Sequence, residues 1–343
     1  MENIFKKFIY SEIGEIYNPK KHKFLKNKEI LITGATGLLG QYFIAFFLKA
    51  LEKKNKPKNI TLIHKNKVPN YLNFLKKNKL FKFYKIDLSK KKIPSNKKYD
   101  YIIHLATYGQ PKKFLADSLK TFILNTSILK DLIFLQKKRG IFLFLSSSEV
   151  YFGLKNKPKE SDIGKINTSM DRAAYIFSKL SGETFLNIYK KKYNLNTKSV
   201  RLCLAFGPGN KKNDNRVIYE LIKKGLIKKK ISLQDNGTSM RSYIYILDAM
   251  KMIINIMFFG KHSTYNVGGN KLISIKKLGK EISKILKCPF ESSKNKVKNL
   301  SAPQIASVNS ELYKKEFGSL SYKNFNASLK KTIEWQKFLY NKN

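Results

Sequence analysis

The chain has 343 residues, 42% of them hydrophobic, which is enough to bury a large core in one or two lobes. Its longest suspicious apolar stretch, residues 252–259, is shorter than the roughly 18 residues that a membrane-spanning helix needs, and we see no secretory signal at its start. Cys203 and Cys288 are too few for a disulfide framework and have no metal-ligand spacing, so we expect a cytoplasmic protein without a metal site.

The formal net charge of +46 invites a nucleic-acid interpretation. Only five of the 69 basic residues are arginine, and the lysines are spread through every polar stretch rather than gathered on one stripe. This distribution is typical of a coding bias that places lysine at any tolerant exposed position. We therefore expect no specific nucleic-acid partner, only salt-sensitive adhesion to polyanions.

The chain opens on a polar, lysine-rich stretch with a short amphipathic segment from Ile4 to Ile9. We interpret residues 1–23 as a peripheral N-terminal arm. The first strand then follows, and with it a turn dense in glycine.

That turn joins an apolar strand at residues 30–33 to an apolar helix that continues through residues 42–51. Gly34, Gly37 and Gly40 allow a tight turn and let backbone N–H groups approach phosphate closely, while the helix N-terminus adds partial positive charge. The spacing is not the Gly-x-Gly-x-x-Gly of the commonest dinucleotide fingerprint. It nevertheless predicts a cradle for a dinucleotide pyrophosphate.

Strands and helices alternate through the next part of the chain. We predict strands at 59–64, 81–86, 101–105 and 141–145, a helix over 118–138, and another from Tyr175 to about Tyr193. This alternation is typical of a doubly wound α/β fold with a parallel sheet, whose ligands lie beyond the carboxyl ends of the strands. After the second strand, where an acid often binds the adenosine ribose, the chain has His64-Lys65-Asn66-Lys67.

A tyrosine and a lysine on one helix face form the candidate catalytic pair. Tyr175 and Lys179 are four residues apart, and they follow the serines that end the fifth predicted strand. Because a nearby ammonium favours the phenolate, we expect Lys179 to lower the pKa of Tyr175 and make it a usable base. His104 ends a buried strand, and we interpret it as a core residue rather than a catalyst.

These motifs together resemble the extended short-chain dehydrogenase/reductases, in their nucleotide-sugar epimerase/dehydratase group, and within it the UDP-glucuronate decarboxylases. The resemblance covers about residues 28 to 335. Besides the glycine turn, it is carried by Lys120-Thr121 with Asn125-Thr126, Ser147-Ser148-Glu149-Val150-Tyr151, Arg172-Ala173-Ala174-Tyr175 with Lys179, Asp214-Asn215-Arg216-Val217, Gly237 through Arg241 to Asp248, and Tyr265-Asn266-Val267-Gly268.

The resemblance implies a role for each matching position. Cofactor-binding positions are Gly34, Gly37, Leu38 and Gly40 at the pyrophosphate, Asp87 and Leu88 at the adenine, and Leu105 and Ala106 along the cleft. Catalytic positions are Ser147 on the sugar hydroxyl, Tyr175 as base, Lys179 on the nicotinamide ribose, and Glu149 on the 4-keto intermediate. Substrate-binding positions are Ser148, Arg216 and Arg241.

The resemblance implies that the cofactor takes a hydride from the sugar and later returns it. Oxidising C4 of the sugar acidifies C5–H and makes a C6 carboxylate a β-keto acid, so epimerisation, dehydration and decarboxylation all become open before the hydride returns. Ser148 stands where related dehydratases carry an acid, which disfavours dehydration. Three positions depart from the pattern of the group. Leu204 replaces an asparagine that usually touches substrate, Gln304 lies where an arginine is common, and Thr107 to Pro111 differs from the usual loop. These departures leave the identity of the sugar open.

We therefore predict a Rossmann domain (residues 24–206 plus 240–268) and a smaller C-terminal substrate-binding lobe (207–239 plus 269–343). The predicted function is that of a nucleotide-sugar enzyme, decarboxylase-like or a 4-epimerase, which acts as a homodimer on a UDP-sugar. The alternative is an idle dinucleotide-binding sensor or scaffold. NAD is the expected cofactor, and NADP stays open because no acid after the second strand would repel its 2′-phosphate.

Overall fold

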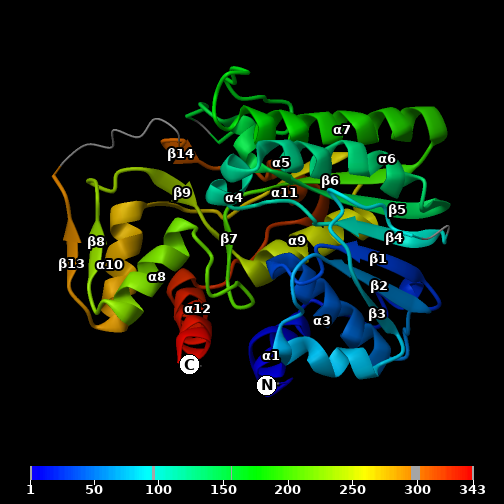
Figure 1. Cartoon of the computed structure of the whole chain (residues 1–343), viewed down its shortest axis with the longest axis horizontal. Helices are drawn as coiled ribbons and strands as arrows, with labels where there is room; N and C mark the ends of the chain where they lie inside the picture. The colour runs from blue at the N-terminus through cyan, green and yellow to red at the C-terminus, as the bar shows by residue number, and fades with distance from the viewer. Residues whose placement is uncertain (1, 95–96, 156, 295–301, 342–343) are drawn as a thin grey trace.

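The structure is a computed structural model that describes residues 2–341 except 95–96, 156 and 295–301. Its centre is a seven-stranded parallel sheet in the order β11-β6-β5-β4-β1-β2-β3 (Figure 1). The strands are β1 (Glu29–Thr33), β2 (Asn59–His64), β3 (Phe81–Lys85), β4 (Tyr99–His104), β5 (Gln136–Ser147), β6 (Asn196–Leu202) and β11 (Thr264–Val267). The order reverses between β1 and β4, which confirms the predicted doubly wound α/β sheet and places a ligand crevice at those strand ends.

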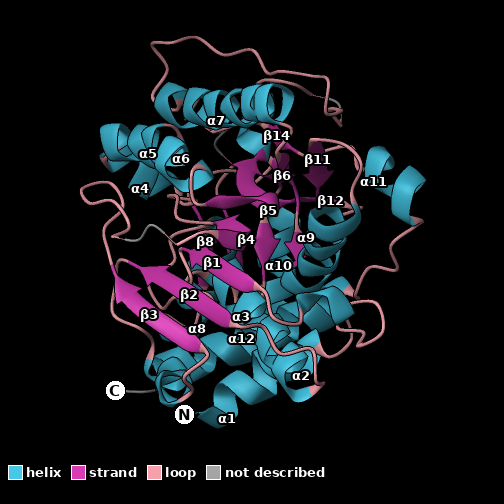
Figure 2. Ribbon diagram, turned by 90° about the vertical axis from the view of Figure 1, so that its right-hand side faces the viewer, coloured by secondary structure: helices cyan, strands magenta, loops and turns pink. Residues whose placement is uncertain are grey.

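Helices cover both faces of this sheet (Figure 2). One layer holds α4 (Pro111–Ala116), α5 (Ser118–Asn125), α6 (Ser127–Ile133) and α7 (Ala173–Tyr193), and the other holds α3 (Leu38–Glu52) and α9 (Ile246–Phe259). Successive strand residues point to opposite faces, so Ile30 and Ile32 pack on the α3 side and Leu31 on the α5 side. The helix expected over 118–138 is instead split at Thr126, whose backbone is not helical, and it ends before β5 begins.

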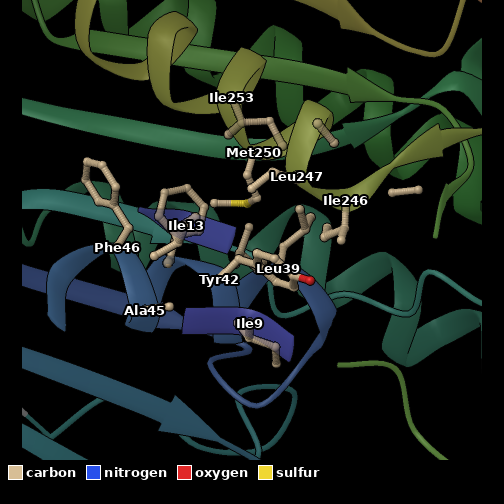
Figure 3. Close-up of a cluster of buried hydrophobic side chains, with 14 of the residues drawn as sticks. Ile9, Ile13, Leu39, Tyr42, Ala45, Phe46, Ile246, Leu247, Met250 and Ile253 are labelled. Carbon is tan, nitrogen blue, oxygen red and sulfur yellow. The ribbon is translucent and has the colours of Figure 1, made fainter. Parts of the chain in front are cut away.

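The N-terminal segment is part of the core, which corrects its interpretation as a peripheral arm. Its elements are α1 (Glu2–Phe5), the π-helix η1 (Lys6–Tyr10), α2 (Ser11–Ile13) and the 3₁₀-helix η2 (Lys23–Leu25). Ile9 and Ile13 are fully buried, beside Tyr42 and Phe46 of α3 (Figure 3). Glu12 accepts hydrogen bonds from the Tyr245 hydroxyl at 2.8 Å. The short apolar pattern did not reveal this packing because its partners lie far away in the sequence.

A smaller group of elements lies beside the main sheet, at the left of Figure 1. It contains α8 (Val217–Ile227), β8 (Ile231–Leu233), β9 (Met240–Ser242), β12 (Leu272–Ser274), α10 (Ile275–Leu286), β13 (Phe290–Ser292), β14 (Ile305–Ala306) and α12 (Phe325–Tyr340). β9 pairs with β12 and β14, so the chain returns to the main domain only at β10 (Ile244–Tyr245), which pairs with β7 (Ala205–Phe206). The predicted domain limits stay an interpretation. The remaining elements are η3 (Asn70–Lys77), η4 (Ser148–Tyr151) and α11 (Glu311–Phe317).

None of the helices described here is both long and apolar enough to cross a membrane. Within the same residues, no three His, Cys, Asp or Glu side chains are grouped so that they could hold a metal ion. Cys203 and Cys288 are both free thiols, and Cys203 is buried.

We expect Ile9→Ala to destabilise the whole fold. The substitution removes a fully buried side chain from the core between η1 and α3, so the free energy of unfolding falls by about 2–5 kcal/mol. Chemical denaturation monitored by circular dichroism measures this, with the exposed Lys7→Ala as the control. Equal stability of the two variants would show that the N-terminal segment is peripheral after all.

Candidate active site

The turn between β1 and α3 leaves a cradle that side chains would fill. Gly34 has a φ of +69°, and a Cβ on it would lie 2.7 Å from the Leu105 carbonyl. A Cβ on Gly40 would lie 2.5 Å from the Ala35 carbonyl oxygen. Gly37 precedes the first residue of the 15-residue helix α3, so the N–H groups of that helix's first turn have no carbonyl partner within the helix. These features fit the pyrophosphate of a dinucleotide.

The end of β4 is tied to β1 next to this cradle. The Thr33 hydroxyl accepts hydrogen bonds from the N–H groups of Leu105 and Ala106, both at 3.2 Å. It also lies 2.7 Å from Nδ1 of His104, whose Nε2 lies 2.8 Å from a backbone carbonyl of α5. Burial lowers the pKa of His104 to about 4, so the ring is a neutral core group, in line with its interpretation from the sequence. In the next loop, the Thr107 hydroxyl is buried without a hydrogen-bond partner among the described residues, which suits a polar ligand.

The ends of β2 and β3 meet on the other side of the cradle. Lys65 Nζ lies 3.0 Å from Oδ2 of Asp87 and donates to the Tyr108 hydroxyl at 3.1 Å. The other Asp87 oxygen accepts hydrogen bonds from the N–H and hydroxyl of Ser89. Burial would raise the pKa of Asp87, but its hydrogen bonds from Ser89 and Lys65 outweigh that and lower it. Leu88 is buried beneath them.

The predicted catalytic residues come together at the end of β5. Ser147 is the last residue of that strand, and Tyr175 and Lys179 lie on the buried face of α7. Lys179 Nζ donates to the Leu145 carbonyl at 2.6 Å and lies 5.7 Å from the centre of the Tyr175 ring. This contact joins α7 to β5 at a position two residues before Ser147.

A glycine sets how closely α7 approaches the sheet. A Cβ on Gly182 would lie 2.7 Å from the Asn125 carbonyl oxygen and 2.8 Å from the Phe144 ring. The Asn125 side chain also donates to the Ser178 hydroxyl at 3.0 Å, so Asn125 of α5 contacts α7 through both its backbone and its side chain. Any larger residue at position 182 would therefore move Tyr175 and Lys179 away from β5.

The expected effect of Lys179 on the Tyr175 pKa is not what the structure shows. Burial raises the pKa of Tyr175, and the influences that lower it come from the Ser147 hydroxyl and the Arg172 charge. Burial also lowers the pKa of Lys179 itself to about 7, although Glu183 acts in the opposite direction. The pKa of Lys179 falls because the buried ammonium has lost its hydration, which disfavours the charged form. The same group donates to the Leu145 carbonyl.

Glu149 and Arg172 form an ion pair beside the phenol. Arg172 Nη1 donates to Oε2 of Glu149 at 2.9 Å, and the Glu149 N–H donates to the Ser147 hydroxyl oxygen at 3.2 Å. The Phe114 ring stacks on the Tyr175 ring with centroids 4.2 Å apart, and the Arg172 guanidinium lies 5.4 Å from the Phe114 centroid. Glu149 is therefore held in one orientation, next to Ser148 at the start of η4.

Arg241 is a partly buried guanidinium without an ion-pair partner among the residues that the structure describes. Among the same residues, its Nη1 donates to the backbone carbonyls of Met240 at 2.8 Å and Gln304 at 3.3 Å. Burial lowers its pKa, while the charges of Tyr243 and Glu149 act in the opposite direction. A partly buried cation with spare donors is suited to an anionic ligand.

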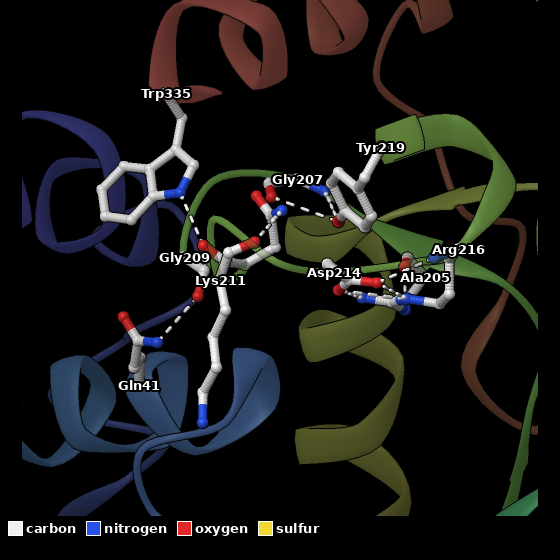
Figure 4. Close-up of polar contacts among 10 residues, drawn as sticks. Gln41, Ala205, Gly207, Gly209, Lys211, Asp214, Arg216, Tyr219 and Trp335 are labelled. Atoms are coloured by element: carbon white, nitrogen blue, oxygen red, sulfur yellow. Dashed lines mark hydrogen bonds and ion pairs between the residues drawn. The ribbon is translucent and has the colours of Figure 1, made fainter. Parts of the chain in front are cut away.

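Arg216, the other arginine predicted to bind substrate, is bound within the protein (Figure 4). Arg216 forms a two-pronged pair with Asp214 and donates to the Ala205 carbonyl at 3.0 Å. Arg201 pairs with Glu183 at 2.8 Å inside the core, which makes it a structural residue. The role of Arg216 in substrate binding stays a prediction.

A separate cavity of about 580 Å³ lies between α10 and the start of α12. Its walls include Phe206, Tyr243, Asp248 and Tyr322. None of the predicted catalytic residues lines it, so it is not part of the site at β5.

Sequence reasoning missed three residues that shape this site: Phe114, Arg172 as the partner of Glu149, and Gly182. Arg172 was detectable, because an arginine retained in a chain rich in lysine commonly has a task that lysine cannot perform. Phe114 and Gly182 had no local signal, since each acts through a contact with a distant segment.

Comparisons with known proteins identify a family for most of the chain. Residues 30–268 match the model of the NAD dependent epimerase/dehydratase family. Curated relatives include UDP-glucuronic acid decarboxylase 1 of Xenopus tropicalis (26% identical, covering 77% of this chain and 62% of the relative) and UDP-glucuronic acid decarboxylase 6 of Arabidopsis thaliana (23% identical, covering 78% and 77%). The match to the frog enzyme thus spans less than two thirds of its length.

Solved structures share the fold. A UDP-N-acetylglucosamine 4-epimerase from Methanobrevibacter ruminantium, in complex with UDP-N-acetylmuramic acid, has a TM-score of 0.74 at 22% identity, covering 92% of this chain and 99% of its own. A UDP-glucuronic acid 4-epimerase from Bacillus cereus, in complex with UDP-glucuronic acid and NAD, has a TM-score of 0.74 at 22% identity, covering 91% and 99%. From the match over residues 30–268, the chain belongs to the NAD dependent epimerase/dehydratase family.

Proposed function

We propose that this protein is an NAD-dependent enzyme that modifies a nucleotide sugar through a transient 4-keto intermediate. The observation that carries the proposal is the placement of Tyr175 beside the Ser147 hydroxyl, with Lys179 one helical turn behind. The cradle at Gly34 and Gly40 supports a dinucleotide next to it. Nothing in the geometry favours the idle sensor, which would need the cradle but not these three side chains.

In the proposed reaction the cradle at Gly34 and Gly40 would hold NAD, which would supply a reversible hydride acceptor for C4 of the sugar. Ser147 hydrogen-bonds the C4 hydroxyl, and Tyr175 takes its proton in the phenolate form, which the Ser147 hydroxyl and the Arg172 charge favour against the effect of burial, so that a C4 ketone forms. Lys179, with its pKa near 7, holds the nicotinamide ribose and gains a polar partner in place of the Leu145 carbonyl. Phe114 stacked on Tyr175 keeps water from that face of the phenol.

Among the possible outcomes we favour decarboxylation of UDP-glucuronate, with 4-epimerisation as the second candidate. Arg172 pairs with Glu149, and the Arg241 charge acts on the same carboxylate, so the local charge favours an anionic sugar or its diphosphate. A C6 carboxylate next to a C5 carbon becomes a β-keto acid once C4 is oxidised, and it then loses carbon dioxide without a strong base. The curated decarboxylase relatives support this outcome, and the epimerases of the same fold keep the second one open.

A panel of nucleotide sugars followed by mass spectrometry tests this proposal. We expect UDP-glucuronate to lose the mass of carbon dioxide, whereas an unchanged mass with a new stereoisomer would indicate epimerisation. Tyr175→Phe keeps the packed ring but has no proton acceptor, so turnover should fall by about 10²–10⁴-fold while NAD still binds. A panel without any turnover, or a Tyr175→Phe enzyme within about tenfold of wild type, would contradict the proposal.

Arg241→Lys should weaken nucleotide-sugar affinity without affecting the fold. Losing a charge-assisted hydrogen bond costs about 1.5–3 kcal/mol, which corresponds to roughly a ten- to hundredfold higher Kd by calorimetry. NAD affinity should not change. The matched control is Arg201→Lys, which breaks the core pair with Glu183 and should lower the thermal stability instead. Equal substrate affinity in Arg241→Lys and wild type would remove Arg241 from the site.

We also propose a homodimer, in the cytoplasm, that pairs through the outer faces of α5 and α7. Exposed apolar side chains gather on this layer: Leu119 (74% exposed), Phe122, Ile188 and Tyr193. Sedimentation velocity should show a dimer for wild type and a monomer for Leu119→Lys. Ile227→Lys, on exposed residue 227 of α8, is the control and should stay dimeric. A wild-type monomer would overturn the proposal.

A further inference from the structure

One loop leads from the end of β7 to an arginine that we predict to bind substrate. It comprises residues 207–216, between β7 and the start of α8, and it carries Asp214 and Arg216. Gly209 and Asn210, in its middle, are both buried. Buried backbone groups need hydrogen-bond partners within the protein, so the partners of this loop determine where it lies.

Side chains from α12 and from α3 donate to the backbone of this loop. Trp335 Nε1 donates to the Asn210 carbonyl at 3.0 Å, and the Tyr340 hydroxyl donates to the carbonyl two residues further along at 2.7 Å. Both side chains belong to α12, which lies in the same predicted lobe as the loop. Gln41 of α3 donates through Nε2 to the Gly209 carbonyl at 2.8 Å (Figure 4). Gln41 thus ties the loop to the helix that begins at the cofactor cradle.

The Gln41 side chain also contacts the cradle itself. Its Nε2 donates to the carbonyl of Thr36, the residue before Gly37 in the glycine turn, at 3.3 Å. Its Oε1 accepts a hydrogen bond from the Tyr71 hydroxyl at 3.0 Å, and the whole residue is buried. Because two carbonyl oxygens face Nε2, a flipped amide would place its own oxygen against both of them. The amide is therefore a bridge of fixed orientation between the cradle and the loop.

Gly209 is the point at which the loop packs against α3. Its φ is +97°, a conformation that side-chain-bearing residues rarely adopt. A Cβ on it would lie 3.3 Å from Ile9 of the N-terminal segment and 3.4 Å from Leu38, the first residue of α3. Leu38 is one of the predicted cofactor-binding residues. The loop therefore contacts the predicted cofactor site by packing as well as by the Gln41 hydrogen bond.

Hydrogen bonds run on along the loop to Arg216. The Asn210 side chain donates to the Lys211 carbonyl at 3.2 Å, and the same carbonyl accepts the Asp214 N–H at 3.1 Å. Asp214 in turn accepts the backbone N–H of Arg216 at 3.1 Å and its guanidinium at 2.7 Å. A displacement in the middle of the loop is therefore passed on to Arg216.

We propose that Gln41 is a positioning residue that couples the cofactor cradle to the binding of the substrate's nucleotide. It holds the 207–216 loop on the cradle, so a dinucleotide that fixes the glycine turn also fixes Arg216, and each ligand strengthens the binding of the other. The inference rests on the proposed function in requiring a dinucleotide at the cradle and a nucleotide at Arg216. It gives Gln41 no contact with either ligand, and it leaves the sugar chemistry unchanged.

Titration calorimetry with NAD and with UDP measures this coupling without any turnover. UDP is the probe because it has no sugar, so contact between a sugar and the nicotinamide cannot contribute. We expect UDP to bind NAD-saturated wild type roughly two- to tenfold more tightly than nucleotide-free wild type, which is the effect of about one hydrogen bond, and NAD to gain the same factor from UDP. Gln41→Met keeps nearly the same side-chain size but has no donor, so the coupling should disappear while each ligand alone binds with nearly unchanged affinity. A merely structural role would instead change the stability or the separate affinities.

The matched control is Tyr340→Phe, which removes one hydrogen bond to the Lys212 carbonyl of the same loop from α12 rather than from α3. Its coupling should equal that of wild type. Gln41→Asn carries an amide that is one methylene too short to span both carbonyls, so it should also lose the coupling, and it replaces Gln41→Met if that variant does not fold.

Independent binding of NAD and UDP to wild type would overturn the inference and leave the proposed function standing. Full coupling in Gln41→Met, or an equal loss of coupling in Tyr340→Phe, would also overturn it. Failure of wild type to bind NAD or UDP at all would contradict the proposed function instead.

Discussion

The site depends on how closely α7 lies against the sheet. Gly182 leaves room for the Asn125 carbonyl and the Phe144 ring, and the buried Lys179 ammonium is held on the Leu145 carbonyl at 2.6 Å. Together these contacts fix the turn of α7 that carries Tyr175 at the end of β5, beside Ser147. A buried cation is costly unless it is hydrogen-bonded, so the same contact that positions the candidate catalytic pair also stabilises Lys179 in the core. The geometry of the candidate site and the packing of the core therefore depend on the same contacts.

Much of the fold could be predicted from the sequence because its signals are local. Apolar runs separated by helices predict a parallel sheet, and the glycines at 34, 37 and 40 predict a turn that only residues without a Cβ can form. Ser147 and His104 were correctly expected at the carboxyl edge of the sheet, although the predicted strands ended at residues 145 and 105 and the observed ones end at Ser147 and His104. In a parallel sheet the direction of each strand determines the edge at which its last residue lies. The candidate site followed from the same rule.

The rest depends on contacts between distant segments, which no local pattern encodes. The N-terminal segment was taken as peripheral, yet Ile9 and Ile13 complete the core against α3. Arg201 and Arg241 look alike in the sequence, but Glu183 neutralises only the first. The pKa of Tyr175 was expected to fall, whereas burial raises it, because the spacing of two residues on a helix says nothing about how deeply they lie.

The central claim is that the hydride leaves C4 of the sugar and returns to it. The most direct measurement uses UDP-glucuronate labelled with deuterium at C4, with the product analysed by mass spectrometry and the coenzyme by absorbance. If the coenzyme returns the same hydride to C4, the product keeps its deuterium and no reduced coenzyme accumulates. Loss of the deuterium to solvent, or one reduced coenzyme formed for each product, would contradict the account.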